Sequence, residues 1–339
     1  MTRAFGSLIL LALMVGSAVQ SQEIPRLDAK EGELKKFINV DSKDVLTKLE
    51  VLQHSIFLAE QKLTNLTFMI QYGSSLSFEK VLYRNYDNEF IPGYVFGPKV
   101  LEKGKRYPAL VVVHGGYHLS FSDDYFGFIK LAVDNGYIVI FPEYRGSKGY
   151  GAEHYNAIDY GGKEVDDVLA AADYFAEFRP YVDKDKIAIV GWSHGGMITL
   201  LAIEQAPKRF QCAVDVVGLA DFVAYMSYKP DYRRQDVARQ PRFGGLPFEK
   251  LGAYMDVSPI NHVERIEIPL FVVATTGDEI APVQLHALRL IDVLKAKGKK
   301  FEYKIYDNAP GGHSFTDGDT KEARDAYKRI FEFLARNLR

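Results

Sequence analysis

One stretch constrains the fold more than any other. Residues 187–190 form a short apolar run, residues 191–196 read Gly-Trp-Ser-His-Gly-Gly, and residues 197–205 form a mainly apolar stretch of helical length. This order predicts a strand, a sharp turn and a helix, with Ser193 held strained at the turn because its flanking glycines have no Cβ. A serine hydroxyl alone is a weak nucleophile, so it needs a base, an orienting carboxylate and donors for an oxyanion.

Strand-length apolar runs alternate with helix-periodic segments along the chain. The runs are residues 109–113, 137–141, 187–190, 212–217 and 270–274. Fully apolar strands separated by helices predict an α/β fold with a mostly parallel central sheet and helices on both faces. Residues 301–306 alternate between apolar and polar instead, which predicts a strand near an edge of the sheet.

The first residues have the layout of a secretory signal peptide. Arg3 gives a positive start, residues 8–15 form an apolar run too short to span a bilayer, and small residues follow. We expect a signal peptide over residues 1–21, cleaved after Ala18 or after Ser21. The protein would then be secreted or periplasmic, without membrane contact once the signal is removed. An uncleaved membrane anchor is the competing interpretation.

Residues 22–77 are expected to form a short N-terminal extension, followed by the main domain over residues 78–339. Within the extension, apolar residues recur at spacings of three and four, as on one face of a helix. These residues are Val45, Leu49, Leu52, Ile56, Ala59 and Leu63. We expect the extension to pack on the main domain.

Composition narrows the classes of partner. A net charge of −2 and a pI near 6.5 offer no basic surface for nucleic acid. Cys212 is the only cysteine, which excludes an intrachain disulfide, and its apolar neighbours predict a buried thiol. Histidines do not cluster at zinc spacing, and residues 317–319 lack the further acids of a calcium loop. We therefore expect no metal and no cofactor; the sequence leaves the oligomeric state open.

The base and the acid should lie after Ser193 in the chain. His313 belongs to a glycine-rich loop between the last strand and the last helix. In the α/β-hydrolase fold the nucleophile, acid and base follow in this order, with the histidine in that loop. The acid should follow the strand at residues 270–274, where Asp278 and Glu279 are both candidates. A carboxylate there would fix the histidine tautomer and stabilise the imidazolium.

Two backbone N–H groups are expected to form the oxyanion hole. The His194 N–H, directly after the nucleophile, is the first. The second should come from the loop after residues 109–113, where His-Gly-Gly resembles the loop of esterases. We expect the Gly116 N–H, with Gly115 as the alternative.

Residues 221–259 break the alternation of strands and helices, as lids and binding loops do. They leave the sheet where ligands bind in open α/β folds, so a partial lid over Ser193 is expected. Its candidates for a substrate-facing wall are Tyr225, Tyr228, Phe243 and Phe248. We expect Tyr225 to bind substrate together with Tyr117 and Trp192.

Several separate motifs carry a family resemblance. They are Tyr107-Pro108 before His114-Gly115-Gly116, Tyr-Arg-Gly-Ser-Lys-Gly-Tyr-Gly at 144–151, the motif at 191–196, Ser258-Pro259, Asp278 with Pro282, and Gly312-His313-Ser314-Phe315. From about residue 91 onward the chain resembles the catalytic domain of the prolyl oligopeptidase family of serine peptidases. The resemblance implies an α/β-hydrolase fold with Ser193 as nucleophile and His313 as base. It favours Asp278 over Glu279, because the family's acid precedes a proline at this spacing.

The chain also departs from the family pattern. Tyr117 stands where the family usually has proline, Thr275 stands where a glycine is expected, and no repeated strand pattern of a β-propeller precedes residue 78. Peptidase specificity therefore does not follow from the resemblance. We expect a serine hydrolase of prolyl oligopeptidase type that cleaves short peptides through an acyl-serine intermediate. A carboxylesterase acting on acyl or aryl esters is the alternative, and a non-catalytic binding protein on the same fold is the second alternative.

Overall fold

A computed structural model describes residues 45–338. Contacts divide the chain into two units, Met1–Gln53 and His54–Arg339. The expected signal peptide lies outside the described residues, and so do residues 22–44 of the expected extension. The division falls within α3 (Val45–Tyr72) rather than near residue 77, so residues 54–77 belong to the large unit.

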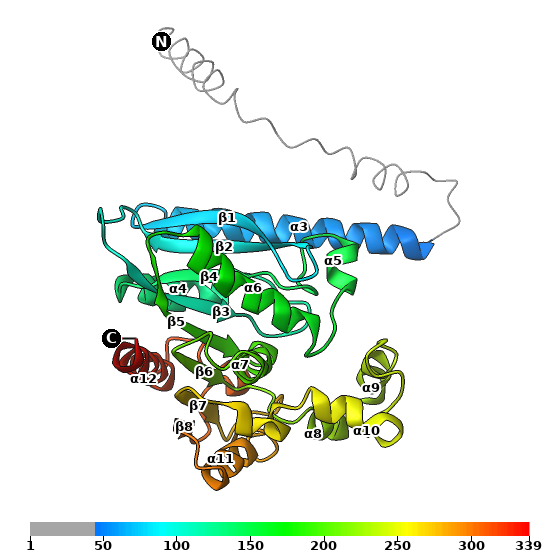
Figure 1. Cartoon of the computed structure of the whole chain (residues 1–339). Coiled ribbons are helices and arrows are strands. Elements are labelled where there is room, and N and C mark those ends of the chain that lie inside the picture. Colours follow the sequence, from blue (N-terminus) through cyan, green and yellow to red (C-terminus); the bar gives the residue numbers. More distant parts are fainter. Residues whose placement is uncertain (1–44, 339) are drawn as a thin grey trace, which may run out of the picture. The chain divides into compact units, whose positions relative to one another are not determined.

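The large unit contains an eight-stranded sheet in the order β1-β2-β4-β3-β5-β6-β7-β8 (Figure 1). Strand β2 is antiparallel to both of its neighbours, and the other pairs are parallel. The strands are β1 (Leu76–Arg84), β2 (Phe90–Pro98), β3 (Tyr107–Val113), β4 (Ile138–Pro142), β5 (Val182–Trp192), β6 (Cys212–Val216), β7 (Leu270–Thr275) and β8 (Phe301–Tyr306). The predicted strands are confirmed, and β8 forms one edge as expected; the β1–β2 hairpin was not predicted.

Helices cover both faces of this sheet, as the apolar strands predict. The helices after α3 are α4 (Phe126–Asp134), α5 (Ala152–Asn156), α6 (Lys163–Phe178), α7 (His194–Gln205), α8 (Phe222–Tyr228), α9 (Asp231–Ala238), α10 (Pro247–Asp256), α11 (Ala287–Ala296) and α12 (Lys321–Asn337). Single 3₁₀ turns lie at η1 (Asp123–Tyr125), η2 (Pro259–Asn261), η3 (Val263–Arg265) and η4 (Gly312–Ser314). Together these elements form the α/β-hydrolase fold.

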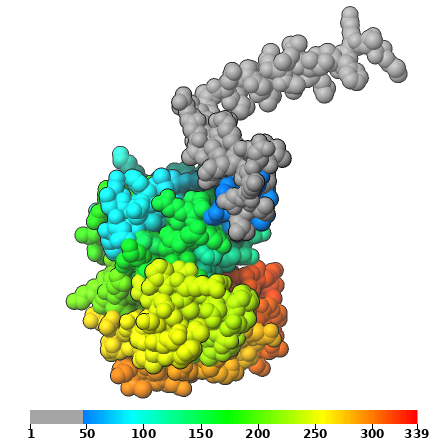
Figure 2. All heavy atoms as spheres, turned by 90° about the vertical axis from the view of Figure 1, so that its right-hand side faces the viewer, coloured from blue at the N-terminus to red at the C-terminus, as the bar shows by residue number. Residues whose placement is uncertain are grey.

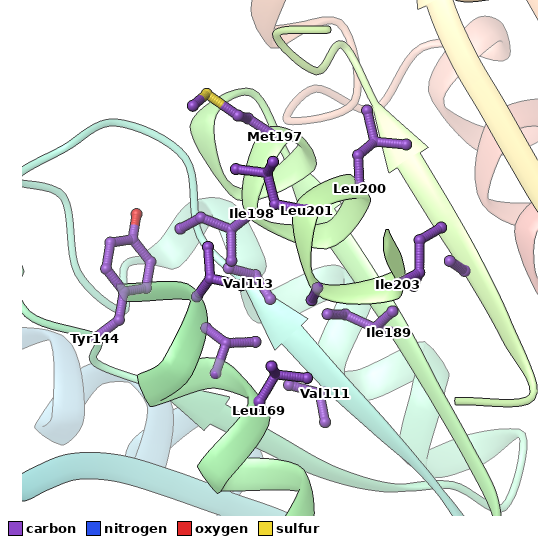
Figure 3. Packing of buried hydrophobic residues seen from close by; sticks show 14 of the residues in the cluster. Val111, Val113, Tyr144, Leu169, Ile189, Met197, Ile198, Leu200, Leu201 and Ile203 are labelled. Atoms are coloured by element: carbon purple, nitrogen blue, oxygen red, sulfur yellow. The ribbon is translucent and has the colours of Figure 1, made fainter. Parts of the chain in front are cut away.

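Two apolar cores lie on opposite faces of the sheet, because successive strand residues point to opposite sides. Val111 and Val113 of β3 belong to the core shared with α6, α7 and α11. Leu110 and Val112 belong to the core shared with α4 and α12. Figure 3 shows the first core, with α7 side chains such as Ile198 close to Val113. The core therefore fixes α7, the helix that begins directly after Ser193.

Helix α3 does not pack through its apolar stripe. From His54 onward the helix packs on the large unit through a different face, on which Gln61, Asn65 and Phe68 are buried. Phe68 joins an aromatic cluster with Phe96 and others. The stripe residues from Leu49 to Leu63 are exposed instead. Helix α3 carries two faces with apolar side chains, and periodicity alone does not reveal which face docks.

The segment at residues 221–259 folds as three short helices, α8 to α10, followed by η2. Figure 2 shows it, in yellow-green to yellow, as a continuous area of the surface. Several of its aromatic rings pack on one another: the Phe243 and Tyr254 ring centroids are 4.3 Å apart. Of the four wall candidates, Phe243 is therefore a core residue of this segment, and Phe248 is exposed.

None of the helices among residues 45–338 combines the length and the apolar character needed to cross a membrane.

Candidate active site

Ser193 lies at a strained turn between β5 and α7. Its backbone has φ 56° and ψ −117°, a conformation that residues with a Cβ rarely adopt. A Cβ on Gly191 would lie 2.0 Å from the Gly195 carbonyl oxygen, and one on Gly195 would lie 2.3 Å from the Val113 carbonyl oxygen. The turn therefore requires both glycines, as the sequence predicts.

The structure brings Ser193, His313 and Asp278 together. His313 Nε2 lies 2.8 Å from Ser193 Oγ, and His313 Nδ1 lies 2.7 Å from Asp278 Oδ2. Because a carboxylate only accepts hydrogen bonds, Nδ1 carries the proton and Nε2 is free to accept one from the serine. The arrangement can therefore deprotonate the serine as it attacks an acyl carbon.

Asp278, and not Glu279, faces the histidine. Its Oδ1 accepts hydrogen bonds from the N–H groups of Ile280 at 2.9 Å and Ala281 at 2.7 Å. The Asp278 side chain is buried, whereas Glu279 is exposed. These two backbone donors hold the carboxylate in place and leave Oδ2 for His313.

Thr275, which departs from the family pattern, joins the acid loop to the histidine loop. Its buried hydroxyl accepts a hydrogen bond from the Ala309 N–H at 2.9 Å and lies 3.4 Å from the Gly277 nitrogen. The threonine therefore positions the loop that carries His313 relative to the end of β7.

The predicted oxyanion donors are both close to Ser193: His194 follows it in the chain, and Gly116 lines the same cavity. The His194 N–H is at the first position of α7, where it has no intrahelical acceptor. The Gly115 N–H already donates to the Tyr125 hydroxyl at 2.8 Å. Gly116 has φ +63°, which favours glycine. Since Gly115 is engaged, Gly116 stays the predicted second donor.

The His194 side chain is buried beside Glu164 and Tyr117. Its Nε2 lies 3.3 Å from Glu164 Oε1, and both side chains are buried. The Tyr117 ring packs edge-on against the His194 ring, with centroids 4.6 Å apart. Sequence reasoning missed Glu164, because one acid in a helical pattern gives no signal of burial.

A cavity of about 310 Å³ opens beside Ser193 and His313. It is lined by Gly115, Gly116, Leu119, Asp124, Tyr125, Trp192, Ser193, Val217, Ile280, His313, Ser314, Asp317 and Tyr327. Of the predicted substrate-binding residues, Trp192 lines the cavity. Tyr117 and Tyr225 do not: both are buried, with ring centroids 6.4 Å apart.

Several lining residues were missed by sequence reasoning. Val217 has φ 47°, which is unusual for a β-branched residue, and its N–H donates to the Val273 carbonyl. Its position at the carboxyl end of the predicted strand over residues 212–217 could have marked it as a lining residue. Tyr125 and Tyr327 both come from the face of the sheet that α4 and α12 cover, and neither belongs to a motif.

Burial shifts the pKa values of two groups next to the site. His114, in the His-Gly-Gly loop, has its pKa lowered to about 3 by burial, so it stays neutral. Asp215 of β6 has its pKa raised to about 7 by burial, and a backbone hydrogen bond from Gly218 opposes the shift. A Cβ on Gly196 would lie 2.3 Å from Asp215 Oδ1, so this carboxyl packs directly against the first turn of α7.

In the part of the chain that the structure describes, no group of three or more histidine, cysteine or acidic side chains is placed to hold a metal ion.

The comparisons with known proteins agree with this geometry. A family model described as "Prolyl oligopeptidase family" matches residues 124–339. The chain is 29% identical over 234 residues to the uncharacterized peptidase YuxL of Bacillus subtilis, covering 68% of this chain and 35% of that protein. It is 26% identical over 255 residues to dipeptidyl aminopeptidase BIII of Pseudoxanthomonas mexicana, covering 72% of this chain and 36% of that protein. The chain thus spans about a third of the length of these relatives.

A solved structure shares the fold. The acylaminoacyl peptidase of Pyrococcus horikoshii superimposes with a TM-score of 0.69 at 21% identity, over 81% of this chain and 44% of that one. At this identity the likeness speaks for the fold alone.

Proposed function

The chain belongs to the prolyl oligopeptidase family, and we propose that it cleaves peptide bonds in short peptides through an acyl-serine intermediate. It is a serine hydrolase whose relatives are named peptidases. The observation that carries the proposal is the continuous hydrogen-bond chain from Ser193 through His313 to Asp278, open to a cavity beside it.

The reaction would begin when Ser193 Oγ attacks the peptide carbonyl carbon and its proton passes to His313 Nε2. Negative charge would develop on the carbonyl oxygen, where the N–H groups of His194 and Gly116 would stabilise it. The C–N bond then breaks, and His313 returns the proton to the leaving amine. A water molecule, deprotonated by His313, then attacks the acyl-serine; the bond between the acyl carbon and Ser193 Oγ breaks, His313 returns the proton to Oγ, and the acid is released.

The size of the cavity favours small substrates. A volume of about 310 Å³ is at the lower end of the range for ligand sites. Two similar proteins are named a dipeptidyl aminopeptidase and an acylaminoacyl peptidase, and we propose short peptides as the substrates of this chain.

A hydrolysis panel tests the proposal against the carboxylesterase alternative. We expect cleavage of p-nitroanilides of short peptides, measured with blocked and with unblocked N-termini, and Ser193→Ala serves as the control for contaminating activity. Cleavage of p-nitrophenyl esters with no cleavage of any p-nitroanilide would favour the carboxylesterase.

We also propose that the enzyme acts outside the cytoplasm, since residues 1–21 read as a signal peptide. Mass spectrometry of the mature protein should find its N-terminus after Ala18 or after Ser21. A mature protein that begins at Met1 would contradict this.

A further inference from the structure

Helix α3 is already docked through one face. Asn65 Nδ2 lies 3.4 Å from the Tyr94 hydroxyl, and Phe68 is fully buried. Glu60 forms an ion pair of 2.7 Å with Lys148. These contacts place one side of the helix against the large unit from His54 onward.

The opposite face of α3 presents an apolar row to solvent, which we call the heptad stripe. Its residues follow one another at spacings of three and four in strict alternation: Leu49, Leu52, Ile56, Ala59, Leu63, Leu66 and Ile70. Leu63 is 66% exposed and Ile70 is 83% exposed. A stable monomer rarely leaves so continuous an apolar row uncovered.

A strict alternation of three and four is the repeat of a coiled coil. Seam residues then occupy positions a and d of each heptad, and the 28-residue helix is long enough for several heptads. A helix that only covers a globular core shows a wider stripe with a period of 3.6 residues. In α3 the positions that face the large unit, such as Gln61 and Phe68, lie opposite the seam. The seam is therefore free to meet another helix.

We propose that the heptad stripe pairs with the same stripe of a second copy of this chain, as an antiparallel two-helix interface. Positions 49 and 66, 52 and 63, and 56 and 59 are symmetric about the midpoint between residues 57 and 58. In an antiparallel pair, position 49 of one copy therefore meets position 66 of the other, and the other two pairs meet in the same way. A single two-fold axis relates the two copies.

The sizes of the side chains favour this orientation. Antiparallel pairing places Ile56 of one copy against Ala59 of the other, so a large residue fills the space beside a small one. A parallel pair in register would set Ala59 against Ala59 and leave a gap in the seam, which destabilises packed interfaces.

The residues that flank the seam are compatible with the antiparallel pair. Lys62 would lie beside Ser55 of the partner, and Glu60 would lie beside Gln53 of the partner. No like charges oppose each other in this register, so the edges of the seam do not resist pairing.

Light scattering of the full-length protein at micromolar concentration tests the pairing. We expect the wild type to have the mass of a dimer and Leu63→Glu to have the mass of a monomer, because two carboxylates would enter the apolar seam. The matched control is Leu82→Glu on β1, since Leu82 is 63% exposed but lies outside the stripe; it should remain dimeric. Circular dichroism and hydrolytic rate should be the same in all three proteins.

A monomeric wild type would overturn the proposal, and the stripe would then be covered by residues before Val45 or by lipid. An unchanged dimer in the Leu63→Glu variant would also overturn it.

Disulfide trapping tests the orientation, since Cys212 is the chain's only cysteine and is fully buried. We expect an equimolar mixture of the Leu52→Cys and Leu63→Cys variants to form a covalent dimer on oxidation, and Leu63→Cys alone to remain uncrosslinked. Crosslinking of Leu63→Cys alone would contradict the antiparallel pair.

Discussion

Two neighbouring residues, Asp278 and Glu279, are both candidates for the carboxylate that orients His313, and their surroundings in the structure distinguish them. Asp278 accepts two backbone hydrogen bonds and faces His313, whereas Glu279 is exposed. The sequence names both candidates, and only the family resemblance favours one. Residue type does not show which of two neighbouring side chains in a loop faces the histidine. Only the spacing between Asp278 and Pro282 in the family motif favours Asp278.

Asp278→Asn should reduce kcat by about 10⁴, because an amide would favour the wrong His313 tautomer. The kcat of Glu279→Gln should be within a factor of a few of the wild-type kcat. Steady-state rates on one p-nitroanilide substrate compare the two variants. Equal losses, or the larger loss at Glu279, would contradict the assignment.

Asp215 gives the stability of the fold a pH dependence. Its pKa is raised to about 7 in the folded chain, whereas an unfolded chain releases the proton near about pH 4. Between about pH 4 and about pH 7 the folded state therefore holds one more proton than the unfolded state. Because of this group, the free energy of unfolding falls as the pH rises through that range.

Asp215→Asn should remove that contribution. Compared with the wild type, the variant should gain free energy of unfolding as the pH rises, by up to about 4 kcal/mol above pH 7. Urea unfolding at a series of pH values measures the difference, and Asp185→Asn at an exposed position is the control. A constant difference between wild type and Asp215→Asn across the window would contradict the account.

Helices and strands can be predicted from the sequence where the apolar residues form a clear pattern. Residues 301–306 alternate, and β8 spans Phe301–Tyr306 at the sheet edge. The β1–β2 hairpin escapes prediction because β1 forms the other edge of the sheet, beside β2, and only three of its nine residues are buried. The docked face of α3 escapes prediction because its contacts come from aromatic and amide side chains, while the aliphatic row faces out.

The turn between β5 and α7 depends on glycine. Gly195→Ala should lower the free energy of unfolding by about 1–3 kcal/mol or more, because its Cβ would meet the Val113 carbonyl oxygen at 2.3 Å. Gly252→Ala in α10, where a Cβ would meet nothing within 4 Å, should be neutral or gain up to about 1 kcal/mol. Urea unfolding compares them, and equal effects would argue against a crowded turn.

At the scale of the whole molecule, the sequence motifs and the fold point to the same family and to the same candidate site around Ser193. Ser193, Asp278 and His313 are far apart in the chain, and the parallel sheet brings them together because its strands end at one edge. The lining of the cavity could not be predicted in the same way. Tyr125 and Tyr327 reach it through tertiary packing that no local pattern records.

The central claim is that Ser193 is an activated nucleophile. A fluorophosphonate probe, followed by mass spectrometry of the digested protein, tests it most directly. The account predicts one covalent adduct, on the peptide that contains Ser193, and no labelling of a folded Ser193→Ala variant. Labelling of that variant at the rate of the wild type, or an unlabelled wild type, would contradict the claim.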